Sequence, residues 1–62
     1  MNSRTDTRQV ILDTAAELFH SHNYSDIGVA RVCEEAGVSK GSFFHFFPTK
    51  KDLALAVVDH VS

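Results

Sequence analysis

The segment 36–53, AGVSKGSFFHFFPTKKDL, constrains the fold of this chain more than any other part of it. Gly37 suits the left-handed backbone conformation that ends many helices, and Ser39 is a natural N-cap for a helix that follows it. Pro48 cannot continue that helix. The segment therefore predicts a helix end, a tight turn, a short helix at about 40–46 and a break. Two short helices joined by such a turn are typical of a helix-turn-helix, whose second helix can enter the DNA major groove.

Apolar residues recur at helical spacing along the rest of the chain, and no segment alternates as a β-strand would. This periodicity predicts a first helix at about 5–22 that stops at Asn23, a loop at 23–28 and a second helix at about 29–36. A further helix begins after Thr49, whose side chain can cap it. The expected fold class is all-α: a three-helix helix-turn-helix bundle plus the start of a fourth, connecting helix.

The apolar faces of these helices should close one small core, onto which two residues of the loop fold back. The residues expected there are Ile11, Leu12, Ala15, Leu18, Phe19, His22, Tyr24, Ile27, Val29, Val32, Cys33, Ala36, Phe43, Phe47, Leu53 and Val57. Phe44 and Phe46 cannot both point inward from one helix, so at least one of them should lie at its outer edge. The fourth helix has a second apolar face, with Leu55 and Val58, that nothing in this chain covers.

Size and charge limit the classes of function. The chain has 62 residues, a single cysteine and a net charge of −2, so it holds one small domain without an internal disulfide. The acidic balance argues against a generic basic nucleic-acid coat. Three of the six lysines and arginines nevertheless lie in or beside the turn and short helix, where a local basic face can bind phosphate. The charges alone equally fit a solvated surface without a partner.

No stretch is long and apolar enough to span a membrane, and the polar first nine residues are not a secretory signal. A cytoplasmic location is therefore the expected one. His20 and His22 are two apart on a helix and cannot chelate a metal together. We find no Ser-His-Asp set, no paired carboxylates and no glycine-rich phosphate loop, so we expect no enzyme, no metal and no cofactor.

The outward residues of the short helix, Lys40, Gly41, Ser42 and His45, include hydrogen-bond donors and no acid. Gly41 costs its helix roughly 1 kcal/mol relative to alanine, and either close approach to DNA or close packing on a neighbouring helix would explain it. Lys50 opposes the dipole of the fourth helix. A phosphate bound at that helix N-terminus would explain why a lysine stands there. The alternative is a lysine that is simply solvated.

With these motifs, the chain resembles the N-terminal DNA-binding domain of the TetR/AcrR family of bacterial transcriptional regulators. The resemblance covers about 7–61 and rests on ILDTAAELF at 11–19, AGVSKGSFFHFF at 36–47 and PTKKDL at 48–53. It implies a domain at 4–62 with its helix-turn-helix motif at about 28–47. It also implies a homodimeric repressor of a palindromic operator, released by a small-molecule inducer. The C-terminal domain that would bind the inducer and carry the dimer interface is absent from this chain.

Two positions depart from the family pattern. Phe44 and Phe46 stand where the family often has tyrosine or histidine, whose polar groups bind phosphate, and Gly28 stands where a serine or threonine often caps the second helix. The residues expected to contact or frame the DNA are therefore Ser39, Lys40, Gly41, Ser42, Phe44, His45 and Lys50. The runner-up interpretation is a helix-turn-helix-like bundle that binds protein, and salt-dependent DNA binding would separate the two.

Overall fold

The computed structural model describes residues 6–61, with the side chains of 6–59, and this part of the chain is helical and contains no strand. Its elements are α1 (Thr7–Ser21), the short 3-10 helix η2 (Tyr24–Asp26), α2 (Val29–Ala36), α3 (Lys40–Phe46) and α4 (Lys50–Val61). The all-α class predicted from the sequence is confirmed. The bounds of α2 and α3 are those that the sequence predicts.

The first helix differs from the prediction at both ends. It begins at Thr7 because the Asp6 side chain accepts a hydrogen bond from the Arg8 backbone N–H at 3.1 Å and caps it there. It ends at Ser21, so the prediction that Asn23 stops it is wrong. Asn23 instead precedes η2, which the sequence analysis treats as plain loop. A 3-10 turn this short has no periodicity to reveal it.

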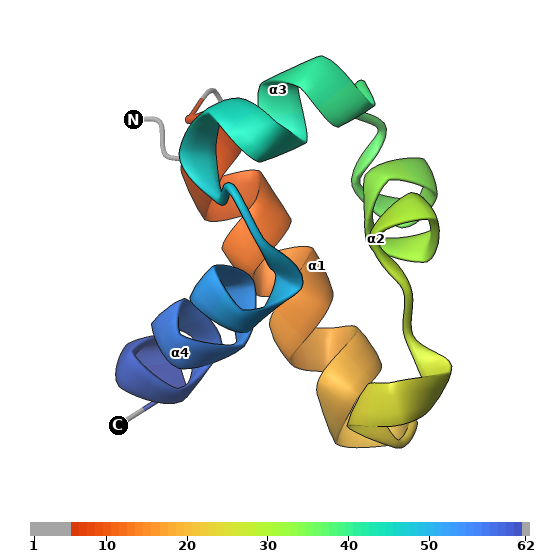
Figure 1. Cartoon of the computed structure of the whole chain (residues 1–62). Helices are drawn as coiled ribbons and strands as arrows, with labels where there is room; N and C mark the ends of the chain where they lie inside the picture. Colours follow the sequence, from red (N-terminus) through yellow and green to blue (C-terminus); the bar gives the residue numbers. More distant parts are fainter. Residues whose placement is uncertain (1–5, 62) are drawn as a thin grey trace.

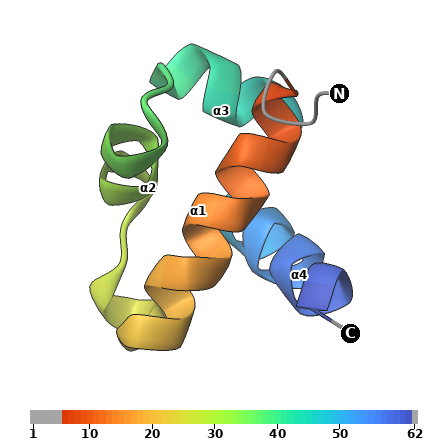
Figure 2. The ribbon, with the colours of Figure 1, turned by 180° about the vertical axis from the view of Figure 1, so that it is seen from behind.

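Helix α1 is the central element of the bundle. Figure 1 shows it running diagonally, with α3 across its N-terminal end, α2 to one side and α4 to the other. From behind, in Figure 2, α1 again runs between α2 on the left and α4 on the right. It contacts each of the other helices, and α2 also contacts α3. This arrangement leaves the outer side of α3 at the periphery of the molecule.

The core lies between these helices and consists of Ile11, Leu12, Ala15, Ile27, Val32, Cys33, Phe43, Phe47, Leu53 and Val57. Leu18, Phe19 and Val29 are partly buried against it, as their spacing predicts. His22 is exposed, and Tyr24 is the other exception, because 45% of it is exposed. Its ring lies against Phe19, with 5.3 Å between ring centres, at the margin of the core and not within it.

The turn between α2 and α3 is fixed by backbone conformation and by caps. Gly37 has φ +72°, the left-handed conformation that its sequence position predicts. The next N–H, that of Val38, donates to the Cys33 carbonyl at 3.0 Å. Ser39 then caps α3 by accepting a hydrogen bond from the Ser42 N–H at 3.1 Å. These bonds set the direction in which α3 leaves the turn.

Helix α4 begins where Thr49 Oγ1 accepts a hydrogen bond from the Asp52 N–H at 3.1 Å, as the capping motif predicts. Leu53 and Val57 are buried against the bundle. Leu55 and Val58, on the other face, are 60% and 63% exposed. No helix in the described part of the chain has the length and apolar character needed to cross a membrane.

Candidate nucleic-acid interface

Helix α3 is anchored by two aromatic rings that point into the core. Phe43 is fully buried, and Phe47, directly after the helix, is 2% exposed. Their ring centres are 5.9 Å apart, so they fill neighbouring positions beneath the helix. With its inner side fixed in this way, α3 leaves most of its other residues exposed.

We call the outward residues of α3 and its cap the α3 face: Ser39, Lys40, Gly41, Ser42, Phe44 and His45. Five of these six residues are exposed and Ser42 is half-buried. The structure therefore brings six of the seven sequence-predicted site residues together on one short helix and its cap. Lys50, the seventh, lies at the start of α4.

Two hydroxyl groups at the start of the α3 face are tied to each other. Ser39 Oγ accepts from the Ser42 N–H at 3.1 Å and donates to Ser42 Oγ at 3.2 Å. The Ser42 hydroxyl can both donate and accept hydrogen bonds, so it can also bind a partner outside the domain. Its position is held in advance by the cap.

The sequence predicts that at least one of Phe44 and Phe46 lies at the outer edge of α3. Phe44 and Phe46 are 42% and 36% exposed, so both, and not only one, lie outside the core. Phe44 packs edge-on against Phe43, and His45 packs edge-on against Phe46 with ring centres 4.9 Å apart. The His45 ring is thus exposed but held in place by a neighbouring ring.

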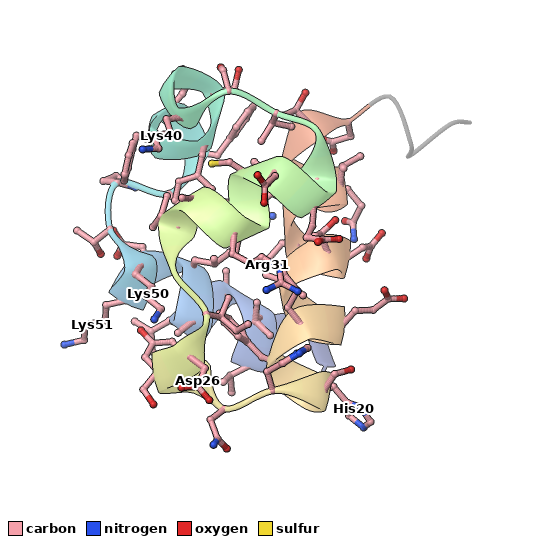
Figure 3. The ribbon with its side chains drawn as sticks, turned by 90° about the vertical axis from the view of Figure 1, so that its right-hand side faces the viewer. His20, Asp26, Arg31, Lys40, Lys50 and Lys51 are labelled. Carbon is pink, nitrogen blue, oxygen red and sulfur yellow. The ribbon has the colours of Figure 1, made fainter. Side chains whose placement is uncertain are left out.

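Positive charge gathers on one side of the domain. Figure 3 shows Lys40, Lys50 and Lys51 toward its left-hand side with Asp26 below them, while Arg31 lies near the centre and His20 at the lower right. Lys40 and Lys51 are exposed and have no carboxylate partner among the described residues. Arg31 is instead paired with Glu35 at 3.3 Å. The lysine side therefore keeps uncompensated charge although the chain as a whole is acidic.

Lys50 is not a freely solvated lysine, which is one of the two explanations that the sequence leaves open. Its Nζ donates a hydrogen bond to the Tyr24 carbonyl oxygen at 3.0 Å. The same ammonium group lies 4.2 Å from the centre of the Tyr24 ring. Lys50 thus links the start of α4 to η2 and is half-buried there.

Gly41 has no close neighbour that would require glycine. A Cβ atom added at this position would meet the Ser39 side-chain oxygen at 3.8 Å, which is ordinary van der Waals contact, and nothing else within 4 Å. Close packing on a neighbouring helix, one of the two explanations offered from the sequence, is therefore wrong for the described residues. Close approach to DNA, the other explanation offered from the sequence, stays a prediction.

Two residues near this interface make contacts that the sequence does not predict. The guanidinium carbon of Arg8, in the first turn of α1, lies 5.4 Å from the centre of the Phe47 ring at the end of α3. Tyr24, expected in the core, instead contacts Lys50. Both contacts join segments far apart in the sequence, so no local signal could have revealed them.

Comparison with known proteins gives a consistent result. Residues 11–57 match the family described as "Bacterial regulatory proteins, tetR family". The chain is 43% identical over 61 residues to YxaF of Bacillus subtilis, an uncharacterized HTH-type transcriptional regulator, covering 97% of this chain and 32% of that protein. It is 42% identical over 53 residues to the HTH-type transcriptional repressor AcnR of Corynebacterium glutamicum, covering 86% of this chain and 28% of that protein.

A third relative is the HTH-type transcriptional repressor NemR of Escherichia coli, 33% identical over 61 residues, with 95% of this chain and 31% of that protein covered. The chain thus spans about a third of the length of these relatives. No solved structure matches it. The relatives are transcriptional regulators, a class of protein distinct from enzymes. The family match and the helix-turn-helix geometry together show that the chain belongs to the TetR family of bacterial transcriptional regulators and is its DNA-binding domain.

Proposed function

We propose that this domain, at 4–62 with its motif at about 28–47, reads one half of a palindromic operator by placing α3 in the major groove. The observation that carries the proposal is the α3 face. It is anchored from within by Phe43 and Phe47, carries no acid, and lies beside lysines that lack carboxylate partners. Such a surface meets the electrostatic and geometric needs of groove binding.

The residues of the interface take different roles in this proposal. Ser42 and His45 lie one helical turn apart and face the base edges, where hydrogen bonds read sequence. Lys40 and Lys50 bind phosphates and position the domain. Gly41 lets the helix backbone approach the DNA closely, and Phe44 touches a sugar or a thymine methyl group. Ser39 orients the helix through its cap.

We further propose that the domain works in the cytoplasm as part of a longer, homodimeric repressor that a small-molecule inducer releases from DNA. Two observations support this. The chain spans about a third of its relatives' length, and Leu55 on the second face of α4 is 60% exposed. A C-terminal domain packed there would cover that face, carry the dimer interface and bind the inducer. The relatives AcnR and NemR are both described as repressors.

Lys50→Ala should weaken binding to all DNA sequences about equally, because a phosphate contact carries no base information. The plot of log K against log salt concentration should become shallower by about 0.9 for each lost contact. The measurement is a DNA titration at several salt concentrations. Arg31→Ala is the matched control, since it also removes one positive charge but from an ion pair away from the lysines.

Loss of affinity for one sequence only would show that Lys50 reads bases. An equal effect of Arg31→Ala would show that total charge, and not the position of Lys50, sets the affinity. DNA binding that does not depend on salt would contradict the proposal as a whole and would favour a bundle that binds protein.

Gly41→Ala should stabilise the domain and weaken its binding to DNA. The methyl group meets no close neighbour in the domain, so the helix should gain roughly 1 kcal/mol from the change in propensity. In the complex the same methyl group would lie between α3 and the DNA and cost about 1–3 kcal/mol, as an overpacked contact does. Chemical denaturation of this variant measures the expected gain in stability, and DNA titration measures the expected loss of affinity. Unchanged DNA affinity would show that the DNA does not approach at Gly41.

A further inference from the structure

We infer that Tyr24 is a positioning residue for DNA binding, which holds the Lys50 ammonium group in place at the start of α4. The inference rests on the proposed phosphate contact of Lys50. Two contacts carry it: the hydrogen bond from Lys50 Nζ to the Tyr24 carbonyl oxygen at 3.0 Å, and the Tyr24 ring 4.2 Å from the same nitrogen. Both come from η2, outside the α3 face.

Tyr24 is itself held firmly enough to act as a support. Its carbonyl oxygen also accepts a hydrogen bond from the Ile27 N–H at 3.1 Å, which closes η2. The Ile27 side chain is 1% exposed and belongs to the core. On the other side, the Tyr24 ring packs against Phe19 of α1. The carbonyl group and the ring are therefore fixed by the bundle before any DNA arrives.

The chemistry of this support preserves the charge of the lysine. A carbonyl oxygen and an aromatic ring attract an ammonium group without carrying a net negative charge. Asp26 belongs to the same 3-10 helix and is exposed below Lys50 in Figure 3, yet it forms no ion pair with Lys50. Arg31, by contrast, is held by the carboxylate of Glu35. Lys50 is thus fixed in position while its full charge stays available to a phosphate.

The geometry also leaves donors for that phosphate. A lysine ammonium group has three N–H donors, and the structure shows one of them used, on Tyr24. A free lysine side chain loses much conformational entropy when it is fixed in a complex, so a side chain held beforehand loses less on binding. Tyr24 should therefore raise DNA affinity through Lys50 without touching DNA.

Tyr24→Leu in the full-length regulator should lower affinity about twofold to fivefold per half-site, for operator and unrelated DNA alike. Leucine keeps apolar packing against Phe19 but has no ring face for the ammonium group. Tyr24→Phe keeps that face and should bind as the parent protein does. Affinities are measured by titration at one fixed salt concentration, and the unfolding free energy of each variant is measured beside them. If Tyr24→Leu does not fold, Tyr24→Met takes its place.

The decisive comparison repeats Tyr24→Leu in a Lys50→Ala background. If Tyr24 acts through Lys50, the second substitution should change affinity no further. The same loss in both backgrounds would make Tyr24 a structural residue only and overturn the inference. If Lys50→Ala weakens binding while Tyr24→Leu does not, the positioning role of the Tyr24 ring fails, because leucine keeps the backbone carbonyl group and removes only the ring contact. If Lys50→Ala leaves binding unchanged, the proposed phosphate contact fails and the inference falls with it.

Discussion

Phe43→Ala should lower the unfolding free energy of the domain by about 3–5 kcal/mol, the usual cost of truncating a buried phenylalanine. Phe43 is fully buried and its ring packs against those of Phe44 and Phe47. A chain of this size has roughly 3–9 kcal/mol of stability at 0.05–0.15 kcal/mol per residue. One substitution thus removes at least about a third of the stability and up to all of it, and α3 loses its inner anchor at the same time.

Helical circular dichroism during urea unfolding measures this effect. Phe46→Ala is the matched control, because the same side chain is removed from the same helix but 36% of Phe46 is exposed. We expect the control to lose well under half as much stability as Phe43→Ala. A Phe43→Ala variant within about 1 kcal/mol of the parent would show that the core closes without this ring.

The helices around the turn could be predicted from the sequence because local signals define them. Gly37 has the positive φ that ends α2, Ser39 caps α3 through the Ser42 N–H, and Pro48 stops α3 from continuing. Each of these effects acts within a few residues along the chain. The start of α1 is predicted less well, because the first nine residues are polar and give no apolar periodicity that would locate the cap at Asp6.

Contacts between distant segments could not be predicted in this way. Tyr24 is predicted to lie in the core because it is aromatic, yet it lies at the margin of the core and contacts Lys50. Arg8 lies over the Phe47 ring because α3 crosses the N-terminal end of α1. Spacing along one helix shows which residues share a face, but the residues opposite that face depend on how the helices cross.

The candidate site is intermediate between these cases. Its outward residues follow from the positions of Phe43 and Phe47, since fixing the inner side of a short helix also fixes its outer side. The contacts that each outward residue makes do not follow from the positions of Phe43 and Phe47. The sequence leaves open whether Gly41 packs on a helix, and the structure excludes that within the described residues. The sequence also leaves open how Lys50 is held. The structure shows that it contacts the uncharged carbonyl group and ring of Tyr24.

His45→Ala and Ser42→Ala should each change the preferred DNA sequence more than the general affinity for DNA. Both residues project from the α3 face, which the proposal places against base edges. His45 is exposed and its ring packs against Phe46, while Ser42 Oγ is held by a hydrogen bond with Ser39 Oγ. Losing one direct base contact should cost roughly 1–3 kcal/mol at the base pair concerned and relax specificity there.

Selection from a random DNA pool, followed by titration of the selected sites, measures this change. The fold should survive both substitutions, since the hydrogen bond that caps α3 comes from the backbone N–H of residue 42 and remains in Ser42→Ala. His20→Ala is the matched control for His45→Ala, because His20 is exposed at the far end of α1 from α3. A variant that selects the same sites as the parent would show that its residue does not read bases. A uniform loss across all sites would instead place that residue on a phosphate, as we propose for Lys50.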